Sequence, residues 1–413
     1  MPAKTTAPKL VDHFFRNEYG RAVSFLTNKF GSHHLELAED AVQEALIRAM
    51  QTWSFGEIPQ NPTAWIIRAS QNKMIDHLRR AGKVTYEEQP PDIHTEDISF
   101  DLETLNDDVI KMMFACSNPK LSTEHQIILI LKILCGLSIK EIASALLKKE
   151  ETIAKAYTRG KKKFQEENLS LDLPSMKEIK GRLRVVLKSI YLLFNEGYKR
   201  TEGDMLISKD LCQEAMRLND ILLANERTNT VSGRSLMALM CFHASRFDSR
   251  LSADGGIISL EEQDRTRWDQ KLIKLGNQYL NSMSKEEVFN EYFLQAAISG
   301  IHCNAKRFED TNWNSILNFY NLLYRLNPNP MIALNRIVPY EKVFGSEEAL
   351  SELKKIESTT QINEHYLFFA IKSDLLKGLG KPGGAKECLE KAIEKAKNQN
   401  EREYLLKKLE HLV

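Results

Sequence analysis

The fold is most clearly encoded in residues 136–143, which read Gly-Leu-Ser-Ile-Lys-Glu-Ile-Ala. Ser138 and Glu141 have the spacing of a capping box, in which each side chain accepts a hydrogen bond from the other residue's backbone N–H at the start of a helix. An apolar pattern continues to Leu146. The stretch therefore predicts a short helix that begins after Ser138.

The neighbouring residues extend this helix into a helix-turn-helix over 121–166. Ser122 can cap a preceding helix that ends near Cys135, and Leu-Lys-Lys at 147–149 supplies a turn. Glu150 then opens the last helix, whose N-terminal residues would read base edges while nearby cations hold phosphates. The alternative is a solvated basic surface. The outward residues of this last helix are predicted to be Lys155, Thr158, Arg159, Lys161, Lys162 and Lys163, with Lys148 and Lys149 at its entrance.

A second basic helix is predicted for residues 64–80, after the start signal Asn61-Pro62-Thr63. Arg68, Asn72, Asp76, Arg79 and Lys83 follow at helical spacing and share a face that can contact phosphates and base edges. Aromatic residues around the preceding loop suit stacking on a single strand. The alternatives are a solvated polar face and aromatic core packing.

Length and composition indicate a multidomain globular protein. The chain has 413 residues, of which 42% are hydrophobic and 27% charged, and its net charge is +1. The six cysteines are scattered without metal-ligand spacing, so we expect no metal site and no cofactor. Without a membrane span or signal peptide, the expected location is the cytoplasm.

The rest of the chain is helical in pattern. Residues 84–105 are acidic and irregular, which indicates a linker. The segment 170–180 is expected to be a short tether to the tail. In the tail, Ala349, Leu353 and Ile356 recur 36 positions later as Ala385, Leu389 and Ala392. This spacing suits helical-hairpin repeats of the tetratricopeptide (TPR) kind, although chance similarity among Ala and Leu is the alternative.

Three motifs in the first part resemble region 2 of sigma-70 family transcription initiation factors: residues 38–49, 62–66 and 76–80. The resemblance implies that the first motif docks on the β′ clamp helices of core RNA polymerase. The others would recognise and melt the −10 promoter element. The implied docking residues are Asp40, Gln43, Glu44 and Arg48. The implied −10 residues are Trp53, Phe55, Arg68, Asn72, Lys73, Asp76, Arg79 and Arg80.

Residues 136–143 resemble the signature of sigma region 4, which grips the −35 element and reaches the polymerase β flap. The chain departs from the usual Arg-x-x-Arg-Ala-Lys that follows, because residues 155–161 read Lys-Ala-Tyr-Thr-Arg-Gly-Lys. The resemblance therefore implies no particular −35 sequence. The implied −35 residues are Lys148, Lys149, Thr152, Lys155, Thr158, Arg159 and Lys162.

The long tail resembles that of the extracytoplasmic-function sigma subgroup with a TPR-like C-terminal extension. The implied all-α plan is region 2 at 8–83, an acidic linker at 84–105, region 4 at 106–168 and the extension at 175–413. His243, Asp254, Asp264 and His302 match no catalytic or metal motif, so we expect no enzyme activity. The extension is expected to regulate the factor in cis or to bind a protein or peptide partner.

Two other functions remain open from the residues alone. One is a helix-turn-helix regulator that acts without polymerase, against which the docking motif argues. The other is an interaction scaffold whose tail is its main working part.

Overall fold

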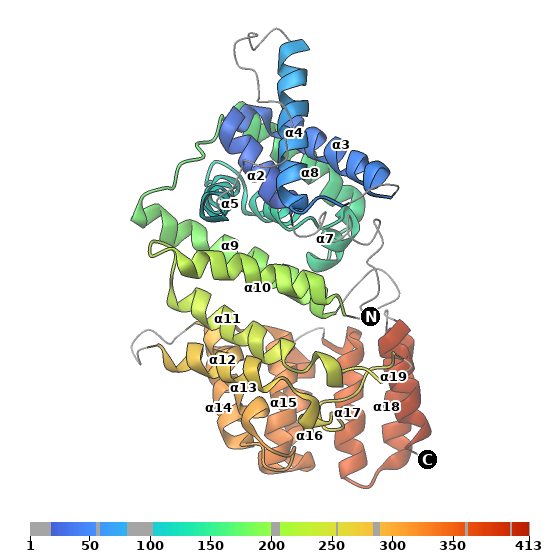
Figure 1. Ribbon diagram of the computed structural model, residues 1–413. Coiled ribbons are helices and arrows are strands. Elements are labelled where there is room, and N and C mark those ends of the chain that lie inside the picture. Colours follow the sequence, from blue (N-terminus) through green and yellow to red (C-terminus); the bar gives the residue numbers. More distant parts are fainter. Residues whose placement is uncertain are drawn as a thin grey trace. The chain divides into compact units, whose positions relative to one another are not determined.

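The computed structural model describes residues 18–54, 58–80, 102–199, 207–252, 255–283, 290–359, 362–396 and 399–412. Within these ranges the regular structure is helical, apart from an isolated antiparallel bridge between Leu251 and Ile257. The expected all-α fold is confirmed. The chain divides into two compact units, Met1–Asn229 and Thr230–Val413, which we describe separately (Figure 1).

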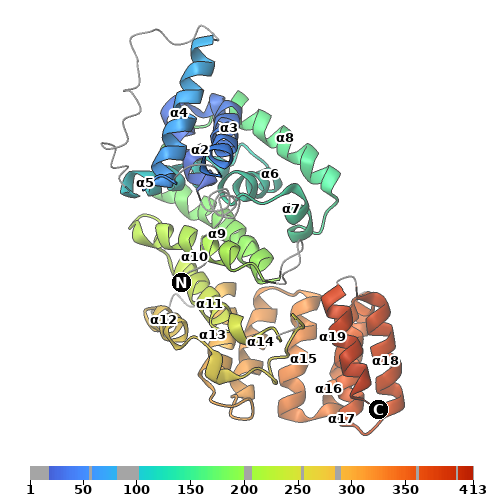
Figure 2. The ribbon, with the colours of Figure 1, turned by 45° about the vertical axis from the view of Figure 1, so that its right-hand side comes forward.

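The first unit combines the two regions expected to contact DNA with the first hairpin of the tail (Figures 1 and 2). Its α-helices are α2 Tyr19–Phe30, α3 Leu35–Trp53, α4 Pro62–Arg80, α5 Leu102–Cys116, α6 Thr123–Leu129, α7 Ile139–Ala145, α8 Glu150–Glu166, α9 Met176–Tyr198 and α10 Lys209–Ala224. Helix α5 begins inside the stretch expected to be a linker, because Leu105, Val109 and Ile110 bury its apolar face. Residues 84–101 of that stretch, and 81–83 before it, lie outside the described residues.

The first two helices of the helix-turn-helix are short and depend on tertiary packing for their stability. Helices α6 and α7 have 7 residues each, too few to be stable alone in water. Helix α6 continues as a π-helical turn, Ile130–Leu134, in which the N–H of Cys135 donates to the carbonyl of Ile130. This turn is buried against α2 and α5, so the helix-turn-helix is anchored to the rest of the unit.

Helices α9 and α10 form a hairpin that packs on the preceding helices of the first unit. A capping box of Ser175 and Glu178 starts α9, which lies against α5, α6 and α7. The expectation of a tether at 170–180 is therefore wrong from Met176 onward, because α9 is already folded onto the unit there. The compact units divide between Asn229 and Thr230.

The second unit is an array of antiparallel helices (Figure 2). They are α11 Val231–Ala244, α12 Gln270–Asn281, α13 Glu291–Asn304, α14 Trp313–Leu326, α15 Pro330–Phe344, α16 Ser346–Thr359, α17 Tyr366–Gly378, α18 Pro382–Lys395 and α19 Gln399–Glu410. Helices α15 and α16 pack as one hairpin and α17 and α18 as the next. The self-similar residues of the sequence lie on α16 and α18 and are buried in both.

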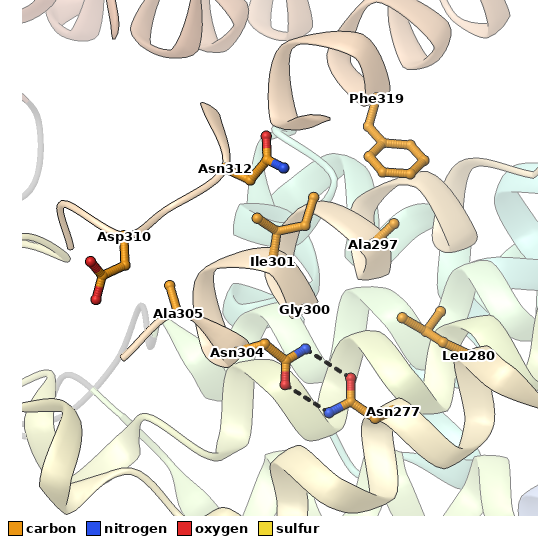
Figure 3. A pocket seen from close by; sticks show the side chains of 10 residues that line it. All are labelled: Asn277, Leu280, Ala297, Gly300, Ile301, Asn304, Ala305, Asp310, Asn312 and Phe319. Carbon is orange, nitrogen blue, oxygen red and sulfur yellow. Dashed lines mark hydrogen bonds between the residues drawn. The ribbon is translucent and has the colours of Figure 1, made fainter. Parts of the chain in front are cut away.

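A pocket of about 390 Å³ opens between α12, α13 and α14 of this unit (Figure 3). It exists because Ala297, Gly300 and Ala305 present little side chain where the helices meet. The amides of Asn277 and Asn304 exchange hydrogen bonds of 2.9 and 3.0 Å along one side. The pocket thus has an apolar floor and an amide rim.

The α9–α10 hairpin depends on the missing side chain of Gly197. A Cβ there would lie 2.8 Å from Leu211 Cβ and 2.9 Å from the backbone nitrogen of Cys212. We expect Gly197→Ala to lower the free energy of unfolding by about 1–3 kcal/mol, because the two helices must move apart. Gly181→Ala, on the same helix with nothing within 4 Å of its added Cβ, should stabilise by up to ~1 kcal/mol. Urea unfolding of the full chain measures both; equal effects would contradict the packing.

Candidate nucleic-acid interface

Helix α3 presents a mixed polar and apolar face to solvent. Ala41, Val42, Ala45 and Ala49 are buried, so the helix turns Asp40 and Gln43 outward. Ile47 and Met50 lie on the same outward side and are 56% and 45% exposed. Sequence reasoning missed these two, although both stand off the buried stripe, which was the available signal.

Glu44 lies between this face and α4. Its carboxylate is 3.1 Å from Lys73 Nζ and 3.4 Å from His77 Nε2, both on α4. The hydrogen bond from Lys73, aided by His77, lowers the pKa of Glu44 below its usual range. Glu44 therefore helps to position α4, and Lys73 is tied to it rather than projecting freely.

Helix α4 carries its polar residues on one side. The side chain of Asn61 accepts the N–H of Ala64 at 3.0 Å and so caps the helix at Pro62. Asp76 and Arg80 are exposed, whereas Arg68, Asn72 and Arg79 are half-buried. The exposure of these polar side chains is therefore greatest near the C-terminal end of the helix.

The structure corrects the prediction that Trp53 stacks on a DNA base. It is only 5% exposed, and its ring packs edge-to-face on Trp65 with centroids 5.4 Å apart. A buried ring presents no face to a base, so the expected stacking role of Trp53 does not fit this structure. Phe55, the other aromatic expected to stack, lies outside the described residues.

The helix-turn-helix has the expected local geometry. Ser122 accepts the N–H of His125, and both bonds of the Ser138–Glu141 capping box are present. Gly160 lets α8 approach α6, because a Cβ there would already be 3.3 Å from the side chain of His125. Leu147 occupies the predicted turn at φ 54° and is 93% exposed, so it joins Ile47 and Met50 as an exposed apolar side chain that sequence reasoning did not foresee.

Helix α8 turns a cationic face to solvent. The exposed residues are Lys148, Lys149, Thr152, Lys155, Thr158, Arg159, Lys162 and Lys163. Several of the lysines pair with glutamates: Lys148 with Glu124 at 2.7 Å, and Lys155 with Glu151 at 2.5 Å. Exposed pairs of this kind contribute about 0–1 kcal/mol, so phosphate oxygens can replace the carboxylates at little cost.

Lys161 does not belong to that face. Its side chain is 17% exposed and points to α3, with Nζ 3.1 Å from Glu36 and 3.3 Å from Glu39. Burial lowers its pKa, but Glu39 and Glu36 together raise it above the ordinary value. The prediction that Lys161 faces outward is wrong, because the carboxylates on α3 bind it.

Comparisons with known proteins identify the families that the regions of this chain match. Family models match as Sigma-70 region 2 over residues 14–84, Sigma-70, region 4 over residues 119–164, and a family of unknown function (DUF6596) over residues 182–284. The "Uncharacterized protein R00370" of Rhizobium meliloti (strain 1021) is 34% identical over 388 residues, covering 92% of this chain and 90% of the relative. The chain belongs to the sigma-70 family. No solved structure matches it significantly.

Sigma regions 2 and 4 together imply a sigma factor for transcription initiation, which binds core RNA polymerase and promoter DNA. This domain pair is that of an extracytoplasmic-function-like factor, here with a DUF6596 extension, in a non-enzymatic family. Among the described residues, no helix is long and apolar enough to cross a bilayer. The same part of the chain contains no cluster of three or more metal-ligating side chains.

The α3 face yields a test of polymerase docking. We expect Asp40→Lys to weaken holoenzyme formation roughly tenfold or more, with a smaller loss at high salt, because the effect is electrostatic. Ile47→Ala should weaken it with little salt dependence. Fluorescence anisotropy with core polymerase measures both. Asp172→Lys is the control, since it makes the same charge change at an exposed site of the same unit; an equal loss there would refute the docking face.

Proposed function

We propose that this sigma factor docks on the β′ clamp helices through α3, recognises and melts a −10 element through α4, and grips a −35 element through α8. Region 4 would also reach the polymerase β flap. One observation carries the proposal: a mixed polar and apolar face on α3 and a cationic face on α8 are exposed on different helices of the same unit. Protein and DNA can therefore be contacted without competing for one surface.

The docking face has the make-up of a protein interface. Buried contacts at an interface are made mainly by a few large side chains, surrounded by a polar rim. Ile47 and Met50 would supply the apolar centre, with Asp40, Gln43 and Arg48 around it. Glu44 would act indirectly by holding α4 through Lys73.

The two DNA-reading helices would divide the work. Lys149 and Thr152 are exposed at the start of α8, the end of a recognition helix that contacts base edges in the major groove, and Thr158 and Arg159 are exposed further along it. On α4, Arg80 and Asp76 are the exposed groups, beside the half-buried Asn72. These would hold and read a separated strand, with Arg68 and Arg79 supporting the backbone contacts.

The extension would regulate the factor in cis or bind a partner. Its first hairpin is already part of the first unit, while α11–α19 have apolar cores of their own around Leu334, Phe368 and Leu389. The paired helices and equivalent buried positions on α16 and α18 support a TPR-like array. The factor would act in the cytoplasm, where its polymerase and promoter are. A regulator without polymerase and a scaffold remain the alternatives.

Truncation after Asn229 tests regulation in cis. This cut keeps the α9–α10 hairpin, so the first unit retains its packing. We expect transcription from the cognate promoter, at matched protein concentration, to differ between the truncated and full chains, because tethering makes even weak contacts effective. Urea unfolding of the shortened protein controls for stability. Identical transcription by both forms would leave the extension without a cis role.

Paired substitutions test the division between the DNA-reading helices. Arg159→Ala should weaken closed-complex binding and reduce the slope of log affinity against log salt by about 1, because one phosphate contact is lost. Once the promoter is saturated, strand opening should be normal. Arg80→Ala should lower the open fraction at saturation. Permanganate footprinting measures opening, and the same phenotype for both variants would contradict the division.

A further inference from the structure

Glu39 is a buried carboxylate shared by the two sigma regions. It is 5% exposed on α3, and its Oε1 accepts hydrogen bonds from Tyr157 at 2.5 Å and from Tyr19 at 3.3 Å. Its Oε2 accepts from Lys161 Nζ at 3.3 Å. A buried charge is tolerated only where such donors replace water. Tyr19 belongs to region 2, whereas Tyr157 and Lys161 belong to the recognition helix of region 4.

The two tyrosines remain donors at any ordinary pH. Burial, followed by the nearby charge of Glu39, raises the pKa of Tyr19 and of Tyr157 well above the usual range. Each hydroxyl therefore keeps its proton and points it at the carboxylate.

Further contacts hold the regions together around Glu39. A Cβ on Gly20 would lie 2.4 Å from the carbonyl oxygen of Leu134, so α2 touches the backbone of the π-helical turn. Ser32 Oγ donates to Asn168 Oδ1 at 3.0 Å. Region 2 and region 4 thus form one closed body.

The α9–α10 hairpin crosses this closed body. Arg182 on α9 donates to the carbonyl of Phe114 on α5 at 3.3 Å. On α10, Glu214 is 1% exposed and pairs with Arg217. The hairpin contacts α5 of the first part and α6 and α7 of the helix-turn-helix, and it leads directly into the extension.

A closed body cannot reach both promoter elements. Positions −35 and −10 are about 25 base pairs apart, roughly 85 Å along B-form DNA. A compact unit such as Met1–Asn229 has a radius of gyration of about 17 Å. In the closed form Glu36 and Glu39 lie beside α8 and pair with Lys161. The two carboxylates neutralise the lysine and repel DNA phosphates from this part of α8.

We propose that Glu39, Tyr157 and Lys161 form a latch that keeps regions 2 and 4 of the free factor closed, and that the latch opens when polymerase and both promoter elements are engaged. This inference rests on the proposed −10 and −35 recognition. Opening exposes Glu39 to water and releases Lys161 toward the DNA. Because the hairpin lies across the closed body, the extension is connected to the element that must move.

The latch predicts the behaviour of Tyr157→Phe, alone and combined with Lys161→Met. Both leave Glu39 with fewer donors, so the open fraction of the free factor should rise roughly tenfold for the single variant and further for the double. Apparent affinity for core polymerase should rise in proportion, since only the open form makes both sets of contacts. Tyr366→Phe is the matched control, because Tyr366 donates to Glu401, which is 8% exposed, within the second unit.

Double electron–electron resonance on the full chain measures the opening. Spin labels at Lys29→Cys on α2 and Lys163→Cys on α8 report the distance between regions, and the native cysteines are buried. We expect a short distance between the two labels in the free wild-type protein and an additional population at longer distance in the two variants. In the promoter complex the distance should be long for all three proteins. An unchanged distribution in the double variant, or a short distance in a transcribing complex, would overturn the latch. Failure to transcribe at all would instead count against the proposed promoter function.

Discussion

A carboxylate removed from water needs hydrogen-bond donors around it, and the position of Glu39 imposes this constraint on the first unit. The donors come from Tyr19, earlier in the chain, and from Tyr157 and Lys161, more than a hundred residues later. Helices α2, α3 and α8 must therefore meet at this point. The close approach of Gly20 to Leu134 accompanies the same arrangement.

The same principle explains how a chain of net charge +1 presents a cationic helix face to solvent. Several of its lysines pair with nearby carboxylates, and what such a pair does depends on its exposure. Lys155 and Glu151 pair in water, where the carboxylate is readily exchanged for a phosphate. Lys161 and Glu39 pair out of water, where the pair fixes structure instead. Glu44 and Lys73, half-exposed, join α3 to α4.

The extension is not a separate addition to the sigma regions. The DUF6596 match begins at residue 182, within α9, and continues to residue 284 in the second unit. Its first hairpin is buried against α5 and the helix-turn-helix, where Gly197 lets α9 and α10 approach closely. The boundary that the family resemblance implied at 175 therefore precedes the boundary set by packing at 229.

The sequence by itself determined the starts of several helices, because a helix cap depends on bonds between residues three or four apart. Asn61 caps α4 and the Ser138–Glu141 box starts α7, as predicted. The family resemblance followed from the same local motifs. Only the tertiary structure decided that Trp53 is buried and that Lys161 faces α3. A polar helix face has the same pattern whether water, DNA or a distant carboxylate covers it, and only packing determines which.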